Sequence, residues 1–292
     1  MPTKIEKDAV TGTDTTGHEW DGIKELNTPL PKWWLYTMYA TIVWGFIWML
    51  LYPSVPLGTT YFKGLLGYSE RAEIAASLKA AADQHAPMLT QLAQTPIEDV
   101  QKNPDLATFA LTGGRAVFAD NCAPCHGPGG SGRPGGFPVL ADDDWLWGGT
   151  REAIQLTLQH GIRNGSPDAR DSAMPRYGAD GLLTPAQIAD VADYVLALAT
   201  PPGTALSPEA KRGAAIYGEQ CVACHGVKGE GLQEFGAPRL SDAIWLYGGD
   251  RAALIRQISA PRQGVMPAWS GRLTDAQIKM LTLYVHSLGG GQ

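Results

Sequence analysis

Two short runs in this 292-residue chain hold cysteine and histidine at the same spacing. In each run two cysteines are separated by two residues, and a histidine follows the second cysteine directly. Two such cysteines can reach both vinyl-derived carbons of one porphyrin, and the histidine is then held beneath the iron as an axial ligand. A disulfide framework or a zinc site also uses paired cysteines, but either leaves the repeated histidine unexplained. The sequence therefore predicts two haem c groups, attached at Cys122, Cys125 and His126 in the first run and at Cys221, Cys224 and His225 in the second.

A methionine–proline pair follows each run and supplies a candidate for the other axial ligand. Met174 lies 48 residues after His126, and Met266 lies 41 residues after His225, so we expect each methionine to serve the histidine of its own copy. A thioether favours ferrous iron and raises the reduction potential. A lone methionine is more often core filler, but this pair recurs in equivalent places. His160 is the alternative sixth ligand in the first copy, unless it is simply a histidine at a helix end.

Three further residues are expected near the haems. The carbonyls of Pro138 and Pro238 lie 12 and 13 residues after the two histidines, where a backbone acceptor would fix the orientation of the ligating imidazole. Arg163 is suited to bidentate contact with a haem propionate; the alternative is a plain surface arginine.

The two runs belong to an internal repeat. The segment 145–149 recurs at 245–249, an offset of 100, and the segment 183–188 recurs at 273–278, an offset of 90. The ten-residue difference arises between residues 160 and 173, which the second copy shortens. Each copy predicts a small all-α domain whose last helix opens with a threonine–glutamine capping box. We place these domains at residues 103–201 and 202–292, with Pro201-Pro202 between them.

Residues 33–52 form a candidate membrane anchor, because they include no Asp, Glu, Lys, Arg or His. Twenty helical residues span about 30 Å, the thickness of the hydrocarbon core of a bilayer. Tryptophan and tyrosine mark both ends of the span, as is typical at membrane interfaces. The excess of lysine before the span favours a cytoplasmic N-terminus in the bacterial inner membrane, and haem attachment on its outer side supports this orientation.

The segments on either side of the anchor carry weaker signals. Residues 1–32 are polar and are expected to form a mobile cytoplasmic tail. Residues 53–102 are expected to form a helical neck. Within the neck we expect a helix from Ser69 to Ala82 that ends by Pro87, and a second helix opened by a capping box at Thr95–Glu98.

Charge limits the classes of partner. The formal net charge is -6 and no basic patch is present, so nucleic acid is not an expected partner. The cluster Asp142–Asp144 gives the first copy an acidic surface that would attract a basic donor cytochrome c. The alternative is that this cluster is only a solvated turn.

The whole arrangement resembles the dihaem subunit of cbb(3)-type cytochrome c oxidase, a haem–copper terminal oxidase. The resemblance covers nearly the full chain, and its motifs are Pro56-Leu57-Gly58 with Tyr68, both cysteine–histidine runs, His160-Gly161-Ile162-Arg163 and both methionine–proline pairs. It implies one transmembrane helix followed by two tandem class I cytochrome c-like domains in the periplasm. It also implies that electrons pass from a donor cytochrome c through this chain to a monohaem cytochrome c subunit and the catalytic haem–copper subunit. No oxygen-reducing site would lie on this chain.

Three other functions fit the motifs. The first is a free-standing, membrane-anchored dihaem carrier. The second is a dihaem peroxidase, which needs one iron with an exchangeable position; the repeated methionine–proline pair argues against it. The third is the cytochrome subunit of a periplasmic dehydrogenase.

Overall fold

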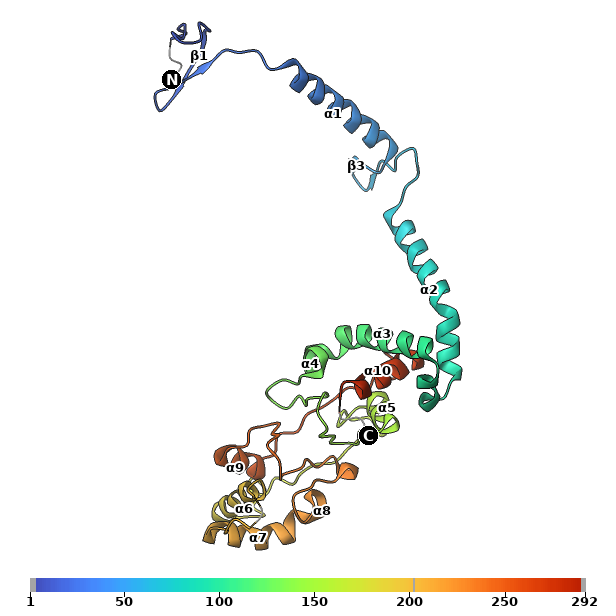
Figure 1. Ribbon diagram of the computed structural model, residues 1–292, viewed down its shortest axis with the longest axis vertical. Coiled ribbons are helices and arrows are strands. Elements are labelled where there is room, and N and C mark those ends of the chain that lie inside the picture. Colours follow the sequence, from blue (N-terminus) through green and yellow to red (C-terminus); the bar gives the residue numbers. More distant parts are fainter. Residues whose placement is uncertain (1–3, 202, 290–292) are drawn as a thin grey trace. The chain divides into compact units, whose positions relative to one another are not determined.

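The computed structural model describes residues 4–201 and 203–289 and divides into two compact units, Met1–Gln84 and His85–Gln292 (Figure 1). Each unit is described by itself. The chain is mainly helical, as the sequence predicts. Pro202, at which the second copy is expected to begin, lies outside the described residues.

The N-terminal segment contains a β-hairpin, which the expectation of a mobile tail did not include. Strands β1 (Thr15–Trp20) and β2 (Ile23–Leu26) pair antiparallel. Asp21 and Gly22 join them, both with positive φ (50° and 82°), as a two-residue hairpin turn requires. The aspartate–glycine pair between Trp20 and Ile23 was the sequence signal for this turn.

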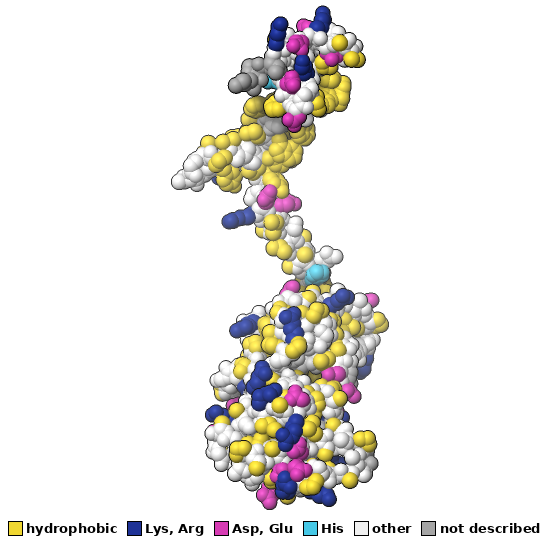
Figure 2. Space-filling view, turned by 90° about the vertical axis from the view of Figure 1, so that its left-hand side faces the viewer, with side chains coloured by type: hydrophobic (Ala, Val, Ile, Leu, Met, Phe, Trp, Pro, Cys, Tyr) yellow, Lys and Arg dark blue, Asp and Glu magenta, His cyan; other side chains and the backbone are white. Residues whose placement is uncertain are grey.

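Helix α1 (Lys32–Leu51) is the predicted anchor. Within the described residues it is the one helix long and apolar enough to cross a membrane, with a mean hydropathy of 1.4 and no buried residue. Hydrophobic side chains cover its surface in the space-filling view (Figure 2). A short hairpin of β3 (Pro56–Leu57) and β4 (Thr60–Tyr61) follows.

The neck differs from its prediction in two ways. Helix α2 (Glu70–Gln94) continues through Pro87 instead of ending there. Proline removes one helical hydrogen bond, but the turns after it bury Leu92 completely. The next element, η1 (Ile97–Lys102), is a 3-10 helix without a side-chain cap, because the Thr95 hydroxyl donates to Gln91 O (2.8 Å) within the last turn of α2.

The two copies contain parallel sets of helices. The first copy has α3 (Pro104–Asn121), α4 (Ala123–His126), η2 (Pro128–Gly130), α5 (Arg151–His160) and α6 (Pro185–Leu198). The second copy has α7 (Pro208–Gln220), α8 (Val222–His225), η3 (Gln233–Phe235), α9 (Arg251–Ser259) and α10 (Asp275–Ser287). The predicted capping boxes at Thr184 and Thr274 are both confirmed.

The helices of the two copies exchange partners. The first helix of the first copy, α3, packs along the last helix of the second copy, α10, whereas α6 packs against α7 (Figure 1). One core accordingly joins Phe118 and Ile154 to Leu281, and another joins Val191 to Tyr217 and Leu254. The two copies therefore follow one another in the sequence, but in the structure the last helix of each copy packs against the first helix of the other copy.

Both helix crossings are built in the same way. Gly114 and Gly213 occupy equivalent positions, and a Cβ on either would collide with the backbone of the facing helix, at Met280 and Asp190 respectively. Aromatic pairs lie beside the glycines at equal spacing: the ring centroids are 5.3 Å apart for Phe118–Tyr284 and 5.2 Å for Tyr194–Tyr217. A glycine at each crossing therefore lets the helices approach closely.

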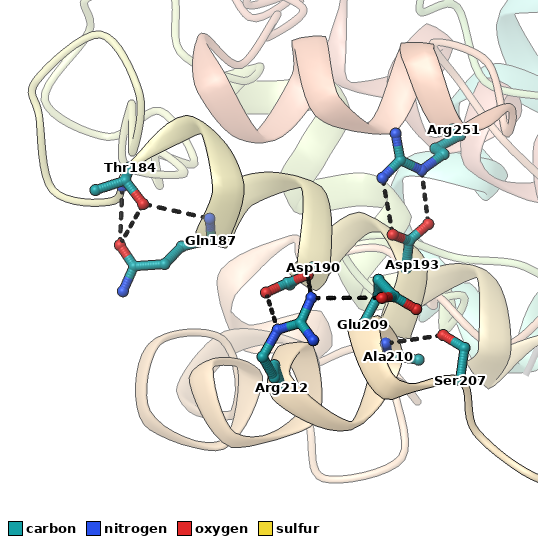
Figure 3. A network of polar contacts seen from close by, with 9 residues as sticks. All are labelled: Thr184, Gln187, Asp190, Asp193, Ser207, Glu209, Ala210, Arg212 and Arg251. Atoms are coloured by element: carbon teal, nitrogen blue, oxygen red, sulfur yellow. Dashed lines mark hydrogen bonds and ion pairs between the residues drawn. The ribbon is translucent and has the colours of Figure 1, made fainter.

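Ion pairs also tie α6 to the second copy (Figure 3). Asp190 receives two hydrogen bonds of 2.8 Å from Arg212 of α7, and Asp193 receives two from Arg251 of α9, at 2.7 and 2.8 Å. These contacts lie at the surface and add to the crossed packing without creating it.

Candidate haem-binding site

The candidate ligands His126 and His225 each end a one-turn helix that begins just after the first cysteine of its run. The His126 N–H donates to Cys122 O (2.8 Å), and the His225 N–H donates to Cys221 O (2.9 Å). This turn brings both cysteines and the histidine of each run close together, as attachment to one porphyrin requires.

The histidine side chains are oriented by the two proline carbonyls that the sequence singled out. The His126 Nδ1–H donates to Pro138 O (3.2 Å), and the His225 Nδ1–H donates to Pro238 O (3.0 Å). Burial lowers the pKa of both imidazoles, although the carbonyl contacts oppose this effect. Burial thus favours the neutral imidazole, and the contact through Nδ1 leaves Nε2 available to an iron.

The four cysteines are all free thiols. Burial, with a smaller contribution from the second cysteine of the run, raises the pKa of Cys122 and of Cys221 to about 11. Protonated thiols do not suit a thiolate metal centre, and among the described residues no group of three or more histidine, cysteine or acidic side chains is arranged to hold a metal ion by itself. Unpaired thiols are what thioether bonds to a porphyrin need.

A cavity of about 510 Å³ adjoins both cysteine–histidine runs. Its lining is largely aromatic and aliphatic and includes Trp145, Trp245 and both candidate methionines. An apolar cavity with a few ligating groups fits a large planar cofactor. These residues fit haem c.

The structure brings each methionine to the other copy. Met174 packs against the core that Cys221 also contacts, and Met266 packs against the core that contains Cys122. This packing does not support the expectation that each methionine serves the histidine of its own copy. The physical reason is the exchange of helices, because each methionine loop leads directly into a last helix that packs in the other copy's core.

Reciprocal backbone hydrogen bonds hold the crossed loops in place. Ile162 and Met266 exchange two of them, at 3.0 and 2.9 Å. After Met174, the N–H groups of Gly178 and Ala179 both donate to Ser259 O at the end of α9, at 3.1 and 3.0 Å. Each methionine loop is thus fixed to the end of the helix that precedes the equivalent loop of the other copy.

Comparison with known proteins covers the entire chain. Residues 12–59 match the N-terminal domain of cytochrome oxidase-cbb3, FixP; residues 111–199 match cytochrome c; and residues 208–285 match cytochrome C oxidase, cbb3-type, subunit III. The cbb3-type cytochrome c oxidase subunit CcoP of Azospirillum brasilense is 51% identical over 294 residues, covering 98% of this chain and 99% of that protein. The chain belongs to the CcoP/FixP family of cbb3-type cytochrome c oxidase subunits.

Other members agree over the same length. The FixP subunit of Bradyrhizobium sp. (strain ORS 278) is 51% identical over 292 residues, all of both chains. The CcoP subunit of Cereibacter sphaeroides is 49% identical over 280 residues, 95% of each chain. The sequence similarity to these oxidase subunits extends over the anchor, the neck and both repeats. It therefore favours an oxidase subunit over the three alternatives: a free-standing carrier, a peroxidase and a dehydrogenase subunit.

Within this CcoP/FixP chain, Arg163 is not a plain surface arginine. Its guanidinium is half buried, and it donates from Nε to Gly264 O (2.8 Å) and from Nη1 to Ser172 O (3.0 Å). His160 is the last residue of α5, and it does not line the cavity. The structure therefore favours the helix-end interpretation of His160.

The acidic cluster does not form one exposed face. Asp143 is exposed, whereas Asp142 and Asp144 are partly buried and line the cavity. Burial raises the pKa of both carboxyls, and Asp242 of the second copy raises it further. Two of the three aspartates thus face the interior of the crossed pair, which weakens the argument for this cluster as a docking surface.

Sequence reasoning missed one reciprocal contact beside the cavity. Trp147 occupies the space that a Cβ on Gly236 would need, and Tyr247 occupies the same space beside Gly136. An arginine lies over each ring, Arg170 over Trp147 at 5.4 Å and Arg262 over Tyr247 at 5.0 Å. The repeated Trp/Tyr-Gly-Gly segment was the available signal, but a repeat alone does not reveal contact between its copies.

Proposed function

We propose that this chain is the dihaem electron-transfer subunit of a cbb3-type terminal oxidase, with crossed axial ligands. Cys122, Cys125 and His126 hold one haem c, and Met266 of the second copy completes its coordination. The other haem is held by the second cysteine–histidine run and by Met174 of the first copy, completing the set Cys221, Cys224, His225 and Met174. The observation that carries the proposal is the packing of each methionine against the core of the opposite run.

The bound haems supply reversible one-electron chemistry at iron. The residues of this chain would set the conditions for it: the cysteines would tether the porphyrin, and the histidines and methionines would ligate the iron. Pro138 O and Pro238 O fix the imidazoles through their Nδ1–H groups. Apolar walls exclude water, and filled coordination leaves no position open for oxygen. This arrangement suits electron transfer rather than oxygen reduction.

The partners follow from membership of the family and from the anchor. The haem-bearing unit takes electrons from a donor cytochrome c and delivers them towards a monohaem cytochrome c subunit and the catalytic haem–copper subunit. Helix α1 fixes the chain in the inner membrane, with its N-terminus in the cytoplasm and the haems in the periplasm. Lysines before the span support this orientation.

Purification of the detergent-extracted full-length chain tests the proposal. Intact mass should exceed the polypeptide mass by two haems, and reduced-minus-oxidised spectra should show two low-spin haems with a methionine-to-iron charge-transfer band. The preparation should also carry haem–copper partners before harsh detergent treatment. One haem per chain, or a high-spin haem in the resting protein, would contradict the assignment; recovery of the chain alone under mild conditions would favour a free-standing carrier.

A further inference from the structure

We propose that Arg163 is a positioning residue that clamps both methionine loops at once; the inference rests on the crossed ligation proposed above. Its two hydrogen bonds end at Gly264 O and Ser172 O. Gly264 stands two residues before Met266, and Ser172 stands two residues before Met174. One guanidinium therefore joins equivalent points of the two loops that supply the axial methionines.

The backbone at Arg163 is held in an unusual conformation. Its φ is +48°, in the left-handed region that side-chain-bearing residues seldom adopt. The Arg163 N–H donates to Arg170 O (2.9 Å), while Ile162 exchanges its two bonds with Met266. A strained backbone conformation of this kind is kept only where several surrounding contacts fix it. At Arg163 this conformation accompanies the placement of the side chain between the two loops.

The chemistry of the contact requires arginine. Both acceptors are backbone carbonyls, which need directed N–H donors, and the guanidinium offers such donors in a rigid fork. The side chain is half buried, so water replaces these bonds poorly. A lysine would keep the positive charge but could not hold two separate carbonyls in this fixed geometry.

Neighbouring side chains reach only one loop each. Asn164 donates from Nδ2 to Met266 O (3.1 Å) and to His160 O (2.8 Å). Gln263, the residue before Gly264, donates to Met174 O (3.3 Å). Within the described part of the chain, Arg163 is the side chain whose hydrogen bonds reach both methionine loops. Substitutions of Asn164 and Gln263 are therefore matched controls, because each removes a hydrogen bond to only one of the two methionine loops.

The clamp predicts how firmly each methionine stays on its iron. Imidazole competes with methionine for ferric haem iron, so its apparent affinity reports how readily the methionine loop opens. Loss of a buried bond from a charged donor is expected to ease opening about tenfold. In Arg163→Gln, imidazole should therefore bind about tenfold more tightly at both haems, with both charge-transfer bands lost at lower imidazole concentration.

The experiment uses the full-length dihaem protein in detergent, titrated with imidazole and followed at the charge-transfer band. Arg163→Lys should behave like Arg163→Gln. Asn164→Ala should shift only the haem that Met266 serves, and Gln263→Ala only the haem that Met174 serves. The two haems are told apart by repeating each titration in full-length chains in which one pair of cysteines is replaced by alanine. Haem content and helical circular dichroism should match the parent in all four variants.

The outcomes separate this inference from the proposed function. Unchanged imidazole affinity in Arg163→Gln, a shift at one haem only, or full rescue by Arg163→Lys would overturn the clamp. A parent protein that lacks the methionine–iron band at both haems would instead overturn the proposed ligation itself. A variant that loses haem or helicity points to a role in folding rather than in positioning, and that result also counts against the clamp.

Discussion

The two helix crossings, α3 with α10 and α6 with α7, have the same glycine and the same aromatic pair but differ in what surrounds them. Beside the first crossing, Met280 and Leu283 are buried against Leu92, Val100 and Leu106 from the neck and from α3. Their equivalents beside the second crossing, at an offset of 90, are Asp190 and Asp193, which are partly buried and form ion pairs with exposed arginines. Contact with the neck therefore accounts for the apolar residues at the first crossing, where the second crossing has aspartates in ion pairs.

Met280→Ala should produce the largest effect, because it opens a cavity in the core beneath the neck. Met280 is 5% exposed, and the substitution should destabilise the haem-bearing unit by about 2–5 kcal/mol. Asp190→Ala at the equivalent position should cost no more than about 1 kcal/mol. Urea unfolding of both variants measures the contrast, and equal losses would show that the neck does not distinguish the two crossings.

The glycines at the crossings should be the next most sensitive positions. Gly114→Ala and Gly213→Ala each force a Cβ against the backbone of the facing helix and should cost about 1–3 kcal/mol. Gly218→Ala is the matched control on α7, because nothing lies within 4 Å of its added Cβ. That control should stabilise the helix by about 0.5–1 kcal/mol. A tolerated Gly213→Ala would argue against the close approach of α6 and α7.

Lys279 offers a test of how the neck is attached. Its ammonium donates to Leu92 O (2.9 Å), Ala93 O (3.3 Å) and Thr95 O (2.8 Å), where it caps the C-terminal end of α2. A cation there also interacts favourably with the helix dipole. Lys279→Met should cost about 1 kcal/mol and expose residues 97–102 to limited proteolysis. Cleavage there at the rate of the parent would show that the cap does not hold the neck.

The exposed pair Asp193–Arg251 should give the smallest effect. Arg251→Gln is expected to cost at most about 1 kcal/mol, and high salt should remove the difference from the parent. Arg212→Gln, beside it on α7, serves as a second exposed example. A loss of stability much larger than about 1 kcal/mol, or one that high salt does not remove, would contradict this expectation. The ion pairs would then determine how α6 packs against the second copy.

Local signals in the sequence predicted local structure well. The cysteine–histidine runs, the proline carbonyls and the threonine–glutamine capping boxes all depend on residues at most 13 positions apart, and the structure places them as their spacing indicates. The Asp21-Gly22 pair also indicates the hairpin from the sequence alone, although we did not predict the hairpin from it.

The exchange of helices was beyond sequence reasoning. Because the two copies share one pattern, α6 and α10 carry similar apolar faces, and either could pack on α3 or on α7. The choice depends on loop length and on contacts such as Ile162–Met266 that join residues about a hundred positions apart. Pro87 failed as a signal for a related reason, since tertiary burial of Leu92 outweighs the local penalty of proline within α2.

Single-haem variants test the crossed ligation most directly. In a chain with Cys221→Ala and Cys224→Ala, one haem remains at Cys122 and Cys125, and the methionine–iron band reports its sixth ligand alone. The account predicts that adding Met266→Ala abolishes this band, whereas adding Met174→Ala leaves it in place. The reverse pattern is expected when the first pair of cysteines is replaced instead. Loss of the band through Met174→Ala in the first background would contradict the crossed arrangement.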